Sequence, residues 1–117
     1  MQFSDPIRNM DKHEDVQEAD NLLHIDYHSM KKSSLILRSL NHNLRQQILK
    51  IIDEEKKITV TEIYVKLRLE QSVASQHLAI LRKAGIVSTQ RQGKFIYYIL
   101  NDERINAIER TVNSLVN

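Results

Sequence analysis

The chain of 117 residues contains no cysteine, no tryptophan, one proline and two glycines. Without cysteine it can form neither a disulfide nor a thiolate metal site. It has no apolar run near the roughly 20 residues that a membrane-spanning helix needs. Its first residues also lack the basic-then-apolar pattern of a signal peptide. We therefore expect a cytoplasmic protein with no membrane partner.

Patterns associated with catalysis are missing as well. The sequence shows no Ser/His/Asp ordering around a glycine-bounded nucleophile, no phosphate-binding loop, and no carboxylate pair isolated from basic neighbours. The acidic run 53–55 is followed directly by two lysines, which is typical of a solvated connection. We expect neither enzymatic activity nor a cofactor.

Charge is distributed unevenly along the chain, although the net charge is only +2. Residues 1–30 carry two basic and seven acidic side chains, whereas residues 31–117 carry 15 basic and eight acidic ones. From Lys66 to Lys94 there are six basic side chains and a single acidic one. A block of one sign is often only a solvated face, but a basic zone is also what a phosphate backbone attracts.

The length indicates a single domain. Residues 1–10 carry no periodic signal and are expected to be a flexible arm, which leaves 11–117 as the folded domain. Apolar residues then recur every three or four positions, predicting one long helix or two consecutive helices over about 12–40. We expect a kink at Ser33–Ser34. The polar joint 41–43, where an asparagine can act as a cap, precedes a helix over about 43–54.

A helix-turn-helix is predicted in the middle of the chain. Thr59 and Glu62 have the spacing of a capping box, which places a helix start at Val60. That helix runs to about residue 67, and a short turn leads into a second helix over 71–84. Gly85 follows, as expected just past a helix end. Two short helices joined by a three- or four-residue turn are typical of this motif.

Gly93 lies between two segments with strand-like alternation, 86–90 and 94–100, and a glycine there suits a tight hairpin turn. The face with Ile96, Tyr98 and Leu100 is expected to be buried. A last helix is predicted over about 102–116. Together these elements indicate a mainly α (α+β) fold: a winged helix-turn-helix with a two-stranded β-hairpin wing and helices at both ends.

Three segments, Leu40–Leu49, Leu69–Val87 and Arg91–Leu100, carry a family resemblance. The specific part is Ser-x-His-Leu, followed by Leu-Arg-x-Ala-Gly-Ile-Val and later by Gly-Lys and Tyr-Tyr. In this order and spacing the chain resembles the ArsR/SmtB family of bacterial winged-helix repressors. The resemblance implies a homodimeric transcriptional repressor that binds an inverted repeat in double-stranded DNA.

The same resemblance implies that the helix 71–84 enters the major groove and that the wing reaches the neighbouring backbone or minor groove. Side-chain chemistry agrees, because glutamine can pair with adenine and serine with several bases. The first turns of a helix also favour phosphate approach through their positive dipole end. The positions that match the family as DNA contacts are Gln71, Ser72, Ser75, Gln76, His77, Arg91 and Lys94.

A dimer interface is expected from the first and last helices. Apolar residues of the last helix are spaced three, four and three apart, a narrow seam typical of helix pairing. The acidic residues 1–30 are expected to lie away from DNA. The residues predicted for the interface are Val16, Leu23, Tyr27, Met30, Ile105, Ile108, Val112 and Leu115.

Two alternatives stay open. Threonines stand at 59 and 61, where the family's metal-responsive members have a thiolate pair. The histidine positions of the family's last-helix site hold Arg104 and Leu115, so neither familiar metal site is expected. His24 and His28, spaced i and i+4, could nevertheless chelate zinc with ligands from a partner chain and make a metal-responsive repressor. The other alternative is a winged-helix protein-interaction module, with the basic helix docking an acidic partner.

Overall fold

A computed structural model of the protein describes residues 23–117. The predicted arm 1–10, the helix expected before Leu23, and Val16 lie outside the described residues. The chain divides after Lys31 into two units, and each is considered by itself. The elements of the described residues begin with α3 (Tyr27–Leu40) and end with α7 (Asp102–Val116).

Helix α3 begins at an aspartate cap. The Asp26 carboxylate accepts hydrogen bonds from the Ser29 hydroxyl at 2.7 Å and from the backbone N–H groups of His28 and Ser29 at 3.1 and 3.3 Å. These bonds, the Ser29 hydroxyl first, lower the pKa of the Asp26 carboxyl. Residues 23–26 are not helical, and α3 continues without interruption through Ser33 and Ser34. Within the predicted helical range of about 12–40, residues 23–26 are therefore not helical, and the serine pair lies inside α3.

Helix α4 (Asn43–Glu55) is capped by a histidine and not by an asparagine. The Nδ1 atom of His42 accepts the backbone N–H of Leu44 at 3.2 Å. At the other end, Lys56 has a positive φ of 71°, and its N–H donates to the carbonyl of Ile52 at 2.8 Å. This closure turns the chain sharply toward the next helix.

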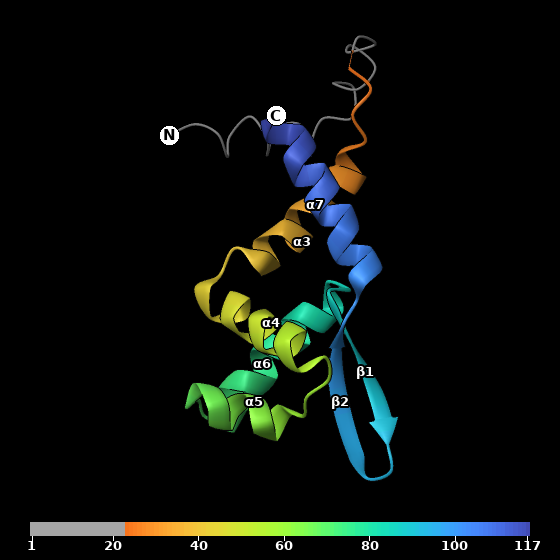
Figure 1. Cartoon of the computed structure of the whole chain (residues 1–117). Helices are drawn as coiled ribbons and strands as arrows, with labels where there is room; N and C mark the ends of the chain where they lie inside the picture. The colour runs from red at the N-terminus through yellow and green to blue at the C-terminus, as the bar shows by residue number, and fades with distance from the viewer. Residues whose placement is uncertain (1–22) are drawn as a thin grey trace. The chain divides into compact units, whose positions relative to one another are not determined.

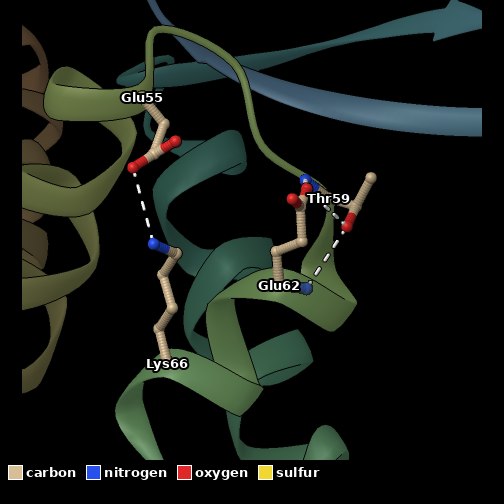
Figure 2. Close-up of polar contacts among 4 residues, drawn as sticks. All are labelled: Glu55, Thr59, Glu62 and Lys66. Atoms are coloured by element: carbon tan, nitrogen blue, oxygen red, sulfur yellow. Dashed lines mark hydrogen bonds and ion pairs between the residues drawn. The ribbon is translucent and has the colours of Figure 1, made fainter.

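Helix α5 (Val60–Leu67) starts with the predicted capping box, which the structure confirms (Figure 2). The Glu62 N–H donates to Thr59 Oγ1 at 3.2 Å, and the Thr59 N–H donates to Glu62 Oε1 at 3.0 Å. Lys66 also forms an ion pair with Glu55 at 3.5 Å, which Figure 2 marks with a dashed line. Both of these side chains are about half exposed, so this ion pair contributes at most about 1 kcal/mol.

Helix α6 (Gln71–Lys83) follows after a short turn in which Arg68 adopts a left-handed φ of 55°. Its end is a Schellman motif. The Ile86 N–H donates to the Leu81 carbonyl at 3.0 Å, and the Gly85 N–H donates to the Arg82 carbonyl at 2.9 Å. Gly85 has a φ of +76°, which explains why glycine stands there. The helix-turn-helix is therefore formed as predicted by α5 and α6.

One apolar core holds these helices together. Each fully buried isoleucine or leucine contributes roughly 1.5–3 kcal/mol through burial of its side chain. Residues of α6 at spacings of four and three face this core, so the opposite side of α6 is turned to solvent. The residues that form the buried cluster are Ile48, Ile52, Ile58, Ile63, Leu78, Leu81, Ile86 and Val87.

The wing is an antiparallel hairpin of β1 (Val87–Gln92) and β2 (Phe95–Leu100), with Gln92 opposite Phe95. Gly93, at a φ of +63°, takes the first of the two turn positions. Tyr98 and Leu100 pack against the core, but Ile96 is 46% exposed. The predicted burial of Ile96 is therefore wrong, because no other helix or strand of residues 23–117 covers the outer half of the hairpin (Figure 1).

Helix α7 follows the hairpin after one residue. Asn101 caps it by accepting the Arg104 N–H at 3.1 Å, and its amide donates to the Gly85 carbonyl at 3.0 Å. Ile105 and Ile108 pack against the core. The fold of the described residues is thus a winged helix-turn-helix flanked by α3 and α7 (Figure 1).

We expect Thr59→Ala to lower the free energy of unfolding by about 1 kcal/mol, the usual loss for removing an N-cap side chain. Urea denaturation followed by circular dichroism measures the change. Thr61→Ala is the matched control, because Thr61 is exposed on the same helix and is not its cap. Its effect should stay within about 0.5 kcal/mol. Equal losses for both variants would show that the capping box does not stabilise α5.

Candidate nucleic-acid interface

The amino-terminal half of α6 presents a polar row to solvent. Gln71, Ser72, Ser75 and Gln76 are all exposed, while Ala74 on the inner side is fully buried. Glu70, the N-cap residue of α6, makes no capping hydrogen bond with its side chain. The first N–H groups of the helix can therefore be approached by an anion such as a phosphate.

His77 differs from the rest of this row. It is only partly exposed, and its Nδ1 lies 3.1 Å from Nη1 of Arg45. Its ring centroid lies 4.8 Å from that of His42. A guanidinium has no acceptor, so Nδ1 must accept this hydrogen bond and the neutral ring carries its proton on Nε2. His77 is thus an internal partner of α4 as well as a member of the row.

The environment of His77 favours the neutral imidazole. Desolvation is the main cause that lowers its pKa, followed by electrostatic interaction with His42 and with the Arg45 guanidinium. A neutral His77 offers one fixed N–H donor at Nε2 and keeps its contact with Arg45. Sequence reasoning placed His77 with the groove-facing residues and did not anticipate this inward contact.

Arg45 connects three helices. Its side chain is only 9% exposed, and its Nε donates to the Ser39 carbonyl of α3 at 2.6 Å. Ser39 is itself buried, and its hydroxyl donates to the Ile36 carbonyl at 2.6 Å. Since Nη1 of Arg45 reaches His77, this one side chain of α4 links α3 to α6. Within residues 23–117 no carboxylate forms an ion pair with it.

The wing gathers three basic side chains. Arg91 and Lys94 are exposed, and Lys94 Nζ lies 5.6 Å from the ring centroid of Phe95. Lys57 comes from the loop before α5, donates to Gln92 Oε1 at 2.9 Å and lies 5.0 Å over the Tyr97 ring. Sequence reasoning treated Lys57 as part of a solvated connection. Its association with the wing depends on the hydrogen bond to Gln92, which lies 35 positions later in the sequence.

The residues predicted for a dimer interface fall into two groups. In the first unit, Leu23 and Met30 are about half exposed and Tyr27 is partly exposed. In α7, Val112 is 38% and Leu115 is 74% exposed. Ile105 and Ile108 instead pack against the core of their own chain. The apolar residues of α7 are therefore divided: the first two pack against the core of their own chain, and the last two, near the end of the helix, are exposed.

His24 and His28 do not have the geometry expected for chelation of a metal ion. His28 lies in α3, but His24 precedes the Asp26 cap and is outside the helix. The two rings therefore do not have the helical i, i+4 relation on which chelation was based. Among residues 23–117, no group of three histidine, aspartate or glutamate side chains could hold a metal ion.

Residues 42–89 match the family described as bacterial regulatory protein, arsR family. The transcriptional repressor PagR of Bacillus anthracis is 32% identical over 91 residues, spanning 78% of this chain and 91% of PagR. The transcriptional activator HlyU of Vibrio cholerae is 33% identical over 85 residues, or 72% and 77% of the two chains.

Solved structures show the same likeness. The crystal structure of PagR aligns with a TM-score of 0.61 and 31% identity, covering 74% of this chain and 99% of PagR. That of HlyU from Vibrio vulnificus CMCP6 aligns with a TM-score of 0.57 and 34% identity, covering 76% and 92%.

We expect the stability of the protein to fall as the pH drops below about 6.5, the pKa of an unperturbed histidine. The lowered pKa of folded His77 means that the unfolded chain binds a proton first, which favours unfolding at acid pH. Above about pH 6.5 His77 is neutral in both the folded and the unfolded chain, and its hydrogen bond with Arg45 contributes fully to stability. Urea unfolding at pH 7.5 and 5.5 measures the difference.

His77→Gln should reduce this pH dependence, since glutamine can accept the hydrogen bond from Arg45 without titrating. His24→Gln is the matched control, because His24 is exposed and outside every helix. It should retain the dependence of the wild type. A loss on acidification that is as large in His77→Gln as in the wild type would contradict the role of His77.

Proposed function

Because this transcriptional regulator belongs to the ArsR family, we propose that it is a homodimeric repressor that binds an inverted repeat in double-stranded DNA. The observation that carries the proposal is the exposed polar row at the start of α6, on a helix whose other face is fixed in the core. This arrangement is suited to a recognition helix, which places its amino-terminal residues on base edges. We propose that the protein acts in the cytoplasm.

Base readout is assigned to the polar row of α6. Gln71 and Gln76 have the amide groups that pair with adenine, and Ser72 and Ser75 can donate to or accept from several bases. His77 contributes through its Nε2–H, because Nδ1 is bonded to Arg45. A histidine fixed in one tautomer offers a base or phosphate oxygen a donor of constant position.

Phosphate contacts are assigned to the wing. Lys57, Arg91 and Lys94 bring three positive charges to one hairpin, and all three are exposed. Contacts of this kind position a protein on the duplex and carry no sequence information directly. They also make affinity depend on salt, because each neutralised phosphate releases counterions.

The proposed dimer is supported by the exposed apolar end of α7. Val112, Leu115 and Val116 are 38%, 74% and 73% exposed, and apolar residues gathered on one helix end favour pairing with another chain. A two-fold dimer would present its recognition helices about 34–36 Å apart, one turn of B-DNA. Repression is preferred over activation because PagR, of which the chain covers 91%, is a transcriptional repressor.

The first experiment is selection of genomic fragments by the purified protein, followed by binding assays over a range of salt concentrations. A DNA-binding regulator should enrich an inverted repeat and lose affinity linearly in log salt, with a slope of about −0.9 per neutralised phosphate. Binding that is absent for every duplex would favour the alternative of a protein-interaction module.

We expect Gln76→Ala to relax sequence preference, because a good base contact is worth about 1–3 kcal/mol of discrimination. Lys94→Ala should instead weaken binding to all duplexes equally and reduce the salt slope by about 1. Fluorescence anisotropy with the selected repeat and with a scrambled duplex measures both effects. Arg110→Ala is the matched control, since Arg110 is exposed on α7 far along the chain from the wing. Equal losses on both duplexes for Gln76→Ala would remove Gln76 from the base readers.

A second prediction concerns the dimer. Leu115→Asp should convert the protein to monomers, because a charge replaces an apolar side chain in the proposed interface. Size-exclusion chromatography with light scattering measures the mass. Asn113→Asp adds the same charge at an exposed α7 position outside the apolar spacing, and it should leave the dimer intact. A Leu115→Asp protein that keeps the mass of the wild type would place the interface elsewhere.

A further inference from the structure

A pocket of about 660 Å³ opens in the second unit between α3, α6 and the start of α7. Its size is within the range of about 300–1,000 Å³ that is common for small-molecule sites. Its basic lining residues are Lys32, Arg38, Arg45, Lys83 and Arg104, and its apolar ones are Leu35, Ile36, Ile80 and Ala84. Among residues 23–117, none of those that line it is acidic.

The basic side chains of this pocket are not paired with carboxylates of residues 23–117. The carboxyl end of α6 offers Lys83 and Arg104 only about half an elementary negative charge. Arg104 lies against Gly85, where a Cβ atom would come within 3.2 Å of Arg104 Nη2. The missing side chain at Gly85 therefore lets a guanidinium reach the pocket wall.

The apolar side chains that line the pocket remain partly exposed to solvent. Leu35 is 54% and Ile80 is 41% exposed, so both can still gain by contact with an apolar group. An occupant that suits the whole lining therefore has an apolar body and a negatively charged head.

Two other occupants fit less well. The pocket lies at the carboxyl end of α6, about 18 Å from the end assigned to DNA, and a phosphate backbone has no apolar part for Leu35 and Ile80. A second copy paired with the two-fold axis through this pocket would bring the same patch against itself. That arrangement would place like charges together.

We propose that this pocket binds an amphipathic organic anion, such as a medium-chain carboxylate, and that the bound anion alters the DNA affinity of α6. The link is Arg45, which lines the pocket and donates a hydrogen bond to His77 on α6. An anion that attracts the Arg45 guanidinium competes with His77 for it. The regulatory half of this proposal rests on the proposed function, whereas the binding half does not.

Isothermal titration calorimetry of the full-length protein with decanoate tests the binding. Decanoate should bind more tightly than hexanoate, by up to about fourfold for each methylene group buried. Decanol, which has the same body without the charge, should bind at least about tenfold more weakly. Equal binding of decanoate and decanol would overturn the proposal.

Lys83→Gln removes one charge at the rim of the pocket and should weaken decanoate binding about three- to tenfold. Lys50→Gln is the matched control, because Lys50 is exposed on α4 and does not line the pocket. It should bind as the wild type does. Equal effects of the two variants would show that binding occurs elsewhere. If only the monomeric Leu115→Asp variant bound decanoate, a second copy would be the occupant and the proposal would be wrong.

Anisotropy of labelled duplex with and without decanoate tests the regulation. We expect the DNA affinity of the wild type to change by about fivefold or more, in the range typical of coupled sites. The change should be smaller in Lys83→Gln at the same decanoate concentration. An unchanged DNA affinity with saturating decanoate would overturn the regulatory half. Absence of DNA binding under all conditions would count against the proposed function and leave the calorimetric result standing.

Discussion

The buried guanidinium of Arg45 is the constraint on which the described structure depends most. A charge removed from water is costly unless polar partners satisfy it. Arg45 finds those partners on two other helices, the Ser39 carbonyl of α3 and Nδ1 of His77 on α6. The helices must therefore keep the spacing that these two hydrogen bonds require. These hydrogen bonds add directional constraints to the packing of α6 on the apolar core, and so help to fix the position of the polar row.

Helix α6 combines two opposite requirements in 13 residues. Its inner side supplies Ala74, Leu78 and Leu81, all with no exposed surface. Its outer side begins with amide and hydroxyl groups that gain nothing from burial. Because the two faces alternate at helical period, the core holds the outer groups in place without any contact to them. Because of this separation, the polar residues can be exchanged without disturbing the core that maintains the fold.

Local signals predicted most of the fold. The Thr59–Glu62 box and Gly85 act through hydrogen bonds within a few residues of each other, and both appear where they were expected. The inward orientation of His77 and the approach of Lys57 to the wing depend on contacts 32 and 35 residues away, which no local pattern encodes. Alternation likewise predicted a buried Ile96, but alternation records which residues share a face and not whether another layer covers that face. The sequence therefore predicted the helix that carries the candidate site, but it did not predict the inward contact of His77 or the contact of Lys57 with the wing.

A single residue separates the wing from α7. Strand β2 ends at Leu100, α7 starts at Asp102, and Asn101 between them is bonded both to Arg104 and to the Gly85 carbonyl. The connection between the hairpin and α7 is therefore short and held by hydrogen bonds, and it is not a flexible linker. In the proposed dimer such rigidity would make the operator geometry intolerant of insertion. One extra base pair between half-sites rotates one of them by about 36° around the duplex, and a stiff junction could not follow that rotation by local bending.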